Sequence, residues 1–271
     1  DIVMPVMNGF EVLAAMAREH WMDDIPIIMI SSEGSEDYIR RAYEMGIADY
    51  IRRPFDAKIV YQRVFNTIKL YAKQRRLISL VADQIYEKEK NNRMMVGILS
   101  QIVEFRNGES GRHILCVNTI TRYLLKQLVR RTDKYPLSKS DITLISTASS
   151  LHDIGKIAIS DAILNKPGRL TAEEFEMIKT HSMVGANMLL DLPIEQQEAP
   201  LVKVASEICR WHHERYDGNG YPDGLKGEEI PIAAQVVALA DVYDALTSER
   251  CYKRAYSHED ALKMILEGRC G

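Results

Sequence analysis

The sequence has few of the features that mark secreted, disulfide-linked or membrane-embedded proteins. Its four cysteines, Cys116, Cys209, Cys251 and Cys270, lie far apart without a C-x-x-C pair, so we expect free thiols and no disulfide framework. No apolar run approaches the roughly 20 residues that cross a bilayer, and no signal-peptide pattern opens the chain. These absences predict a cytoplasmic protein without a membrane-inserted segment.

Excess charge of either sign is also missing. The formal net charge is −3, so general binding to nucleic acid or to a membrane surface is not expected, and a nucleotide substrate would need a local cationic pocket. With 46% apolar and 27% charged residues, the composition is that of an ordinary globular protein. At 271 residues the chain can form one large domain or two modest ones.

The first third of the chain alternates between helical and strand patterns. Helical spacing covers residues 8–19 and 35–45, and short apolar strands are expected at residues 25–30 and 48–51. Alternation of this length favours βα units and a parallel sheet. We therefore expect an α/β fold in this part of the chain.

Motifs in this region resemble those of bacterial response-regulator receiver domains. The opening D-x-x-M-P-x-M-N-G resembles the segment after that family's third strand, and Ile25 to Ser32 resembles its fourth strand. Arg53-Pro54-Phe55 stands where Lys-Pro-Phe is usual, and arginine is not equivalent to lysine in a tight phosphate pocket. The resemblance implies a partial, doubly wound receiver fold. It matches the phosphoacceptor of the parent protein to Asp1, and the switch positions to Ser31, Tyr50 and Arg53.

Residues 1–56 match only the C-terminal part of such a domain. The family's first two strands, first two helices and magnesium-binding acidic pair have no counterpart here, and the last residues, Gly268 to Gly271, also resemble an interior segment. We therefore expect a piece of a longer protein that receives phosphate from a sensor histidine kinase. In this piece Asp1 is expected to be inactive, and the alternative is an ordinary frayed terminal residue.

A long helix is predicted next, because residues 57–104 contain no proline and no glycine before Gly97. We expect residues 57–94 to be a helical linker that includes the last receiver helix. Leu77, Leu80, Val81 and Ile85 fall on one face. Two interpretations stay open: a signalling helix that pairs with its copy in a homodimer, and a helix packed on its own domain.

Histidines concentrate in the remaining two thirds of the chain. An isolated histidine is more often a core or surface residue than a ligand, but His152 directly precedes Asp153. Imidazole with carboxylate suits a borderline divalent metal, and a carboxylate can bridge two ions. Lys156 follows His152 by four residues, which predicts one helical face for both; there Lys156 would meet a phosphate oxygen or be a solvated charge.

Three further clusters accompany this pair. Glu109 and His113 stand four residues apart, so both face one metal if the helix includes residue 109. His212-His213 precede a glycine-rich loop whose N–H groups can approach a phosphate. The last cluster offers two carboxylates on one helical face and then two cationic groups: Asp241, Asp244, Arg250 and Lys253. Each cluster taken alone also fits ordinary structural or surface contacts.

In order, His113, His152-Asp153 and Asp241 resemble the HD phosphohydrolase superfamily. His181 and the string H-H-E-x-x-D-G-x-G-Y-P, which begins at His212, resemble its HD-GYP branch over residues 95–271. The match is C-terminally incomplete. Proline and glycine separate helical periods with few strand signals, so this part is expected to be an all-α bundle of about seven helices.

The resemblance implies a site that holds two or three divalent ions, iron or manganese. Its implied metal ligands are Glu109, His113, His152, Asp153, His181, His212, His213 and Asp241. The residues implied in catalysis are His152, Asp153 and Lys156. Substrate binding is implied for Lys156, Gly220, Tyr221, Asp244, Arg250 and Lys253.

The activity implied by the resemblance is hydrolysis of cyclic di-GMP to linear pGpG, GMP or both, as the output of a bacterial two-component response regulator. Two alternatives remain. One is an HD-type hydrolase of another cyclic dinucleotide. The other is a non-catalytic regulator that binds a nucleotide or a partner such as a GGDEF-domain protein.

Overall fold

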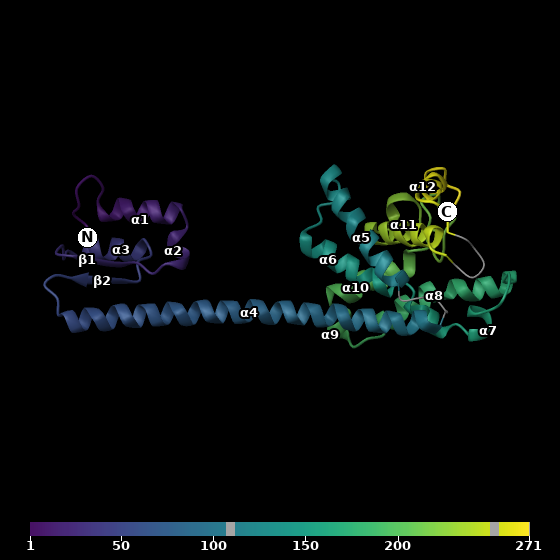
Figure 1. Cartoon of the computed structure of the whole chain (residues 1–271), viewed down its shortest axis with the longest axis horizontal. Helices are drawn as coiled ribbons and strands as arrows, with labels where there is room; N and C mark the ends of the chain where they lie inside the picture. Colours follow the sequence, from purple (N-terminus) through teal and green to yellow (C-terminus); the bar gives the residue numbers. More distant parts are fainter. Residues whose placement is uncertain (107–111, 250–254, 271) are drawn as a thin grey trace. The chain divides into compact units, whose positions relative to one another are not determined.

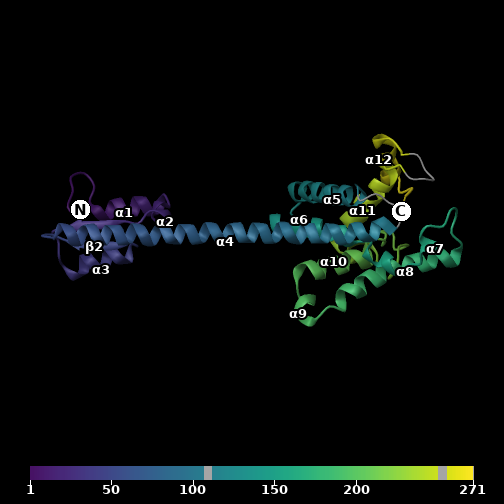
Figure 2. The same cartoon turned by 60° about the horizontal axis from the view of Figure 1, so that its bottom comes forward.

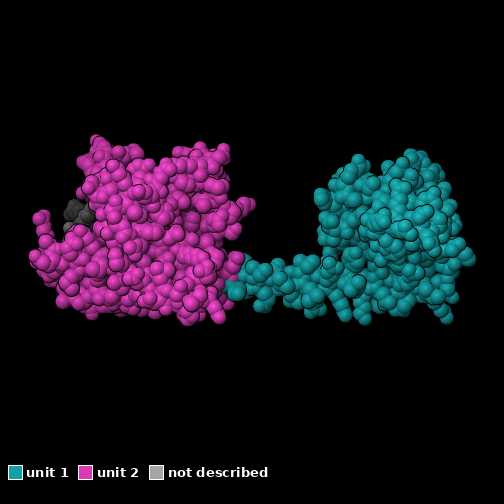
Figure 3. Space-filling model, turned by 180° about the vertical axis from the view of Figure 1, so that it is seen from behind, with its two compact units in different colours: residues 1–88 teal, residues 89–271 magenta. Residues whose placement is uncertain are grey.

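The computed structural model describes residues 1–106, 112–249 and 255–270. The chain forms two compact units, residues 1–88 and residues 89–271, which Figure 3 colours separately. The division falls inside the segment expected to be a linker, while the domain boundaries at residues 56 and 94 stay predictions. No helix of the described residues is long and apolar enough to cross a lipid bilayer.

The first unit has the expected α/β character, with a two-stranded parallel sheet that pairs Ile28 with Asp49 and Ser31 with Arg52. Its helices α1 and α3 begin at side-chain caps, because Asn8 accepts from the N–H of Glu11 and Ser35 accepts from the N–H of Tyr38. The short helix α2 was not predicted. The elements are α1 (Gly9–Arg18), α2 (Trp21–Asp24), β1 (Ile28–Ser31), α3 (Glu36–Glu44) and β2 (Asp49–Arg52).

The residues that resemble receiver switch positions lie in or directly after these strands. Ser31 is fully buried, and its hydroxyl oxygen accepts from the N–H of Glu33. Tyr50 is turned inward, and its hydroxyl donates to the carbonyl of Glu33 at 2.6 Å. Asp1 is paired with Arg53 at 3.1 Å. The Arg53 guanidinium therefore forms an ion pair with the carboxylate that the resemblance identifies as the phosphoacceptor.

Helix α4 (Ala57–Arg106) follows, in agreement with the predicted long helix. From residue 72 to residue 92 every side chain of α4 is exposed, whereas Val96, Ser100 and Val103 near its end are buried. The middle of the helix is therefore exposed. This argues against one of the two interpretations, that of a helix packed on its own domain.

The second unit is helical, as expected. Besides the end of α4 it has six helices of nine residues or more among the described residues, together with the single-turn helices α7 and α9. Three 3₁₀ turns, η1 (Ser149–Leu151), η2 (Ile154–Ala158) and η3 (Gly227–Glu229), connect them. The helices are α5 (Arg112–Arg131), α6 (Lys139–Ala148), α7 (Asp161–Leu164), α8 (Ala172–Leu190), α9 (Ile194–Gln197), α10 (Pro200–Trp211), α11 (Ile232–Thr247) and α12 (His258–Leu266).

The core of this unit lies where α5, α6, α10 and α11 pack together, a grouping that can be followed in Figures 1 and 2. Val117, Leu125, Ile208 and Val237 are fully buried there. Burial of such side chains contributes about 1.5–3 kcal/mol each. The packed helices form the rigid frame that holds the candidate site.

Truncation of this core should be costly. Leu125→Ala is expected to lower the free energy of unfolding of the second unit by about 2–5 kcal/mol, because the cavity cannot fully collapse. Urea titration followed by far-UV circular dichroism measures the change. Leu115→Ala on the same helix is the control, since Leu115 is 67% exposed and should cost no more than about 0.5 kcal/mol. Equal effects of the two substitutions would contradict the assignment of the core.

Candidate metal centre

Five histidines and one aspartate converge inside the second unit from four different segments. His113 lies in the first turn of α5, His152 and Asp153 lie between η1 and η2, and His181 lies on α8. His212 is the C-cap of α10, and His213 follows it. Their ligand atoms form two groups, Asp153 with His181, His212 and His213, and Asp153 with His113 and His152.

Asp153 is the member shared by both groups. Its Oδ1 lies 3.2 Å from Nε2 of His181 and 3.9 Å from Nε2 of His212, and its Oδ2 lies 3.3 Å from Nε2 of His152. The ammonium of Lys156 contacts the same Oδ2 at 2.6 Å. One carboxylate thus faces three imidazoles and one cation.

The orientation of three of these imidazoles is set by the backbone. The Nδ1–H of His152 donates to the carbonyl of Ser149, that of His181 to Ile178 and that of His212 to Ile208, at 2.6–2.9 Å. A carbonyl oxygen can only accept, so Nδ1 carries the proton in each ring. The lone pair of each neutral ring is then on Nε2, which points toward Asp153.

Two atoms of the cluster indicate that a further group belongs there. Nε2 of His152 and Oδ1 of Asp153 are buried and have no hydrogen-bond partner of acceptable geometry in the described part of the chain. Buried polar atoms are nearly always satisfied, and an exception calls for an explanation such as an ion. Imidazole nitrogen and carboxylate oxygen are ligands of borderline divalent metals, so these residues fit metal ions.

The electrostatics place several groups in their metal-binding forms. Burial by itself would raise the pKa of Asp153, but Lys156 and His152 hold that pKa well below its ordinary value. Burial lowers the pKa of His213 to about 4 and that of His212 well below its ordinary value. Asp153 is therefore ionised and both histidines are neutral at neutral pH, as metal coordination requires. His152 differs: burial opposes its protonation, yet Asp153 raises its pKa to about 9, so this ring would have to release a proton to bind a metal.

Asp244 contacts one of the expected metal ligands. It is buried, and its carboxylate accepts from Nδ1–H of His113 at 2.6 Å, while its expected role in substrate binding stays a prediction. This hydrogen bond lowers the pKa of Asp244 against the opposing effect of burial. Asp241, one helical turn earlier, lies 3.5 Å from Nε2 of the same ring. The two aspartates thus meet opposite sides of one imidazole.

The local backbone around His152 is not the α-helix assumed from the four-residue spacing of His152 and Lys156. Two 3₁₀ turns, separated by His152 and Asp153, form residues 149–158, and Lys156 pairs with the same Oδ2 of Asp153 that His152 faces. Gly155 permits this arrangement, because a Cβ there would lie 1.9 Å from the carbonyl oxygen of His181. The close approach of η2 to α8 therefore requires glycine.

The loop after His213 is organised around a buried carboxylate that sequence reasoning did not single out. Glu214 accepts from the N–H groups of Asp223, Gly224 and Leu225 at 2.7–3.0 Å. Gly220 passes so close to Glu214 that a Cβ would lie 2.4 Å from its Cα. These contacts place Tyr221 against His213, with their ring centroids 4.7 Å apart.

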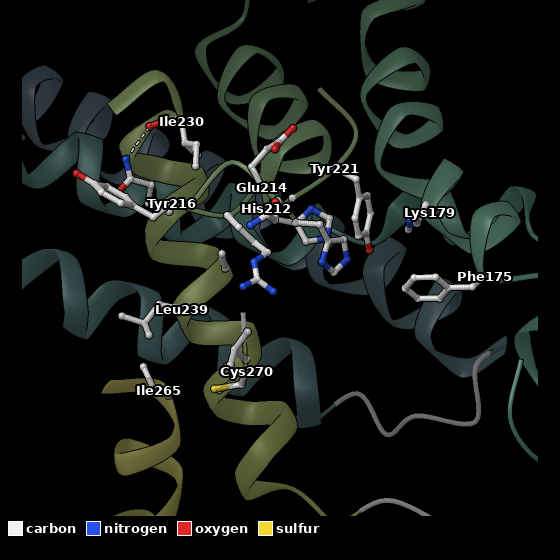
Figure 4. A pocket seen from close by; sticks show the side chains of 17 residues that line it. Phe175, Lys179, His212, Glu214, Tyr216, Tyr221, Ile230, Leu239, Ile265 and Cys270 are labelled. Carbon is white, nitrogen blue, oxygen red and sulfur yellow. Dashed lines mark hydrogen bonds between the residues drawn. The ribbon is translucent and has the colours of Figure 1, made fainter. Parts of the chain in front are cut away.

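A cavity of about 520 Å³ opens beside the imidazoles. Figure 4 shows Tyr221 next to His212, with Lys179 and Phe175 on the neighbouring helix α8. The Lys179 ammonium lies 5.5 Å from the ring centre of Tyr221 and 5.0 Å from that of Phe175. Lys179 stands two residues before His181, and that proximity was the only signal in the sequence that could have identified it.

Three expected site residues, Glu109, Arg250 and Lys253, lie outside the described residues. The other expected ligands all lie in the second unit and, except for Asp241, belong to the two groups around Asp153. Their individual roles remain predictions.

Two family models match the chain. The model of the HD domain matches residues 75–270, and the model of the response regulator receiver domain matches residues 1–65. The first covers the whole metal cluster, and the second covers the α/β elements.

The chain is also similar to curated proteins along nearly its whole length. It is 37% identical to a "Probable cyclic di-GMP phosphodiesterase" of Vibrio cholerae over 99% of this chain and 63% of that protein. It is 34% identical to the "Cyclic di-GMP phosphodiesterase response regulator RpfG" of Xanthomonas campestris, over 99% of this chain and 70% of that one. A "3'3'-cGAMP-specific phosphodiesterase 2" of Vibrio cholerae is 38% identical over 65% of this chain and 32% of that protein.

Acid should destabilise the metal-free protein through its buried neutral histidines. The folded pKa of His213, about 4, lies below its ordinary value, so the unfolded chain binds a proton that the folded chain excludes. The free energy of unfolding should therefore fall as the pH is lowered from about 6.5 to about 4. Denaturant titrations across this range should give a smaller slope for His213→Gln than for the exposed control His20→Gln. Identical slopes would contradict the assignment.

Asp244 should support metal binding through His113. Asp244→Asn keeps the shape of the side chain but removes its charge, and loss of such a hydrogen-bonded partner typically weakens metal affinity about 10–100-fold. Competition with a chromophoric chelator measures the affinity for Mn²⁺. Asp83→Asn on the exposed part of α4 is the matched control. Unchanged affinity in Asp244→Asn would show that the hydrogen bond to His113 is dispensable.

Proposed function

Because the chain belongs to the HD-domain family, in its HD-GYP branch, and carries part of a response regulator receiver domain, we propose that it is a metal-dependent cyclic di-GMP phosphodiesterase. Its products are linear pGpG, GMP or both. The observation that carries this proposal is the pair of largely buried ligand groups that share Asp153. A shared carboxylate can bridge two adjacent divalent ions, which is the arrangement of a two-metal hydrolytic site.

We assign the ligands as follows. His113, His152, Asp153 and Asp241 would hold one ion, and Asp153, His181, His212 and His213 would hold a second. The set of imidazoles and carboxylates favours iron or manganese over a thiolate-seeking metal, and Glu109 is the candidate ligand for a third ion. Bound ions supply Lewis acidity toward water and toward the phosphate oxygens.

The residues of the chain have separate tasks around the substrate. Lys156 fixes Asp153 and carries positive charge at the edge of the site, where it also stabilises a non-bridging phosphate oxygen. Tyr221 forms one wall of the cavity, and Gly220 lets the loop fold closely enough to place it. Arg250 and Lys253 are assigned to the second phosphate. We assign Asp244 to orienting His113, alongside the substrate contact inferred from the sequence.

In the parent protein, the receiver domain would receive the signal as a phosphate group. A receiver domain implies a sensor kinase as partner, and Asp1 is the proposed phosphoacceptor. The ion pair of Asp1 with Arg53 would have to open for phosphate to enter. A GGDEF-domain protein, which makes the same class of substrate, is proposed as a further partner.

A second candidate is hydrolysis of another cyclic dinucleotide. The similarity to a 3'3'-cGAMP-specific phosphodiesterase favours it, because that substrate differs in only one base. A mixed dinucleotide would present the same two phosphates to the metal centre. The substrate choice would then depend on base contacts in the cavity lined by Phe175, Lys179 and Tyr221.

Hydrolysis can be tested directly. The metal-loaded chain, purified without oxygen, is incubated with cyclic di-GMP or with 3'3'-cGAMP, and products are separated by chromatography. Cyclic di-GMP should be converted to pGpG or GMP, and Asp153→Asn should reduce the rate at least about 1000-fold because both ligand groups lose their shared carboxylate. His20→Asn, at an exposed histidine outside the site, is the matched control and should retain full activity.

The outcomes separate the alternatives. Faster cleavage of 3'3'-cGAMP would favour the second candidate. Bound metal in a folded protein that cleaves neither substrate would instead support a non-catalytic regulator, and the proposal would be wrong.

A further inference from the structure

Lys179 extends from helix α8 into the wall of the cavity beside the metal centre (Figure 4). Its side chain is 28% exposed and forms an ion pair at 2.6 Å with Glu176, whose side chain is 69% exposed. Glu176 accepts one of the three N–H donors that an ammonium carries. Among the described residues this ammonium has no other hydrogen-bond acceptor, so its remaining donors are available to a ligand in the cavity.

Two aromatic rings adjoin this ammonium. It lies 5.0 Å from the ring centre of Phe175 and 5.5 Å from that of Tyr221. Phe175 is 46% exposed, and Tyr221 stacks against His213 with ring centres 4.7 Å apart. Nucleobases stack on accessible aromatic side chains. This end of the cavity therefore has the character of a base subsite, separated from an expected metal ligand by one ring.

Arg215 is the other lysine or arginine that lines the cavity in the described part of the chain. Its guanidinium is already engaged, because it donates to Asp217 through Nε at 3.2 Å and through Nη2 at 2.8 Å. Such a two-point contact occupies one edge of the guanidinium fork. The ammonium of Lys179, with a single partner and two neighbouring aromatic rings, is the cation better placed to contact a base.

We propose, on the basis of the proposed function, that Lys179 is a specificity-determining residue that selects guanine at one base subsite of the cyclic dinucleotide. An ammonium can only donate hydrogen bonds. The edge of guanine that carries N7 and O6 offers two acceptors, whereas the same edge of adenine offers N7 and the N6 amino group, which is a donor. Lys179 therefore contacts guanine favourably and meets an amino group when adenine takes its place.

A mixed dinucleotide would be oriented by the same contact. Only one base of 3'3'-cGAMP is guanine, so that base would occupy the subsite of Lys179 and the adenine would lie elsewhere. The same one of the two phosphates would then face the metal centre in every complex. The first cut adds one water molecule across one P–O bond of that phosphate, so it should give one linear dinucleotide in excess of its isomer.

Binding of mononucleotides tests the contact without requiring hydrolysis. In calorimetric titrations of the Mn²⁺-loaded chain, GMP should bind at least roughly tenfold more tightly than AMP. Lys179→Met removes the ammonium but keeps an apolar stem, and it should bring the two dissociation constants within about twofold of each other. Lys203→Met is the matched control, because Lys203 also pairs with a nearby glutamate, Glu198, but does not line the cavity.

The control should keep the wild-type preference for GMP, and circular dichroism and metal content should be the same in both variants. Equal binding of GMP and AMP by the wild-type chain would overturn the proposal. Equal weakening of both nucleotides by Lys179→Met would also overturn it, since that pattern indicates a contact with phosphate instead of the base.

The products of 3'3'-cGAMP give a second readout. After a single cut, the wild-type chain should release one of the isomers pGpA and pApG in roughly tenfold excess, and Lys179→Met should release comparable amounts of both. Tandem mass spectrometry distinguishes the isomers. If GMP is preferred but no cyclic dinucleotide is cleaved, the proposed function fails while the assignment of Lys179 stands. Cleavage of cyclic di-GMP by a chain that binds GMP and AMP equally is the reverse result.

Discussion

The ionised carboxylate of Asp153, buried among imidazoles, is the constraint on which the rest of the site depends. A buried charge is costly unless it is paired, and here Lys156 and His152 pair it. The same environment leaves one carboxylate oxygen without a hydrogen-bond partner in the described part of the chain. Metal binding would satisfy this oxygen.

The fold places the ligands around Asp153 by packing four segments of the second unit against one another. Three ligand imidazoles donate to carbonyls three or four residues earlier in the chain, so the surrounding turns determine which nitrogen faces Asp153. Gly155 allows η2 to approach α8 at backbone distance. Glu214 orders the loop that carries Tyr221, because its carboxylate accepts hydrogen bonds from three backbone N–H groups. The cavity is thus preformed on packed backbone.

Several features of the site were accessible from local sequence and several were not. The adjacent pairs His152-Asp153 and His212-His213, and the glycine-rich loop, could be recognised because they are short and contiguous. The contact of Asp244 with His113 joins residues 131 positions apart, and no local pattern indicates it. The segment of His152 and Lys156 was expected to be α-helical and forms 3₁₀ turns, because a spacing of four residues cannot distinguish the two.

The sequence by itself determined the order of the two parts, the α/β and all-α classes, the long helix and the residue types of a metal centre. These depend on periodicity and composition, which are local properties of the chain. Only the tertiary structure decided which ligands share Asp153, which nitrogen each histidine presents and which face of α4 stays open. Those properties arise from packing between distant segments, where burial shifts pKa values and backbone carbonyls fix the rings.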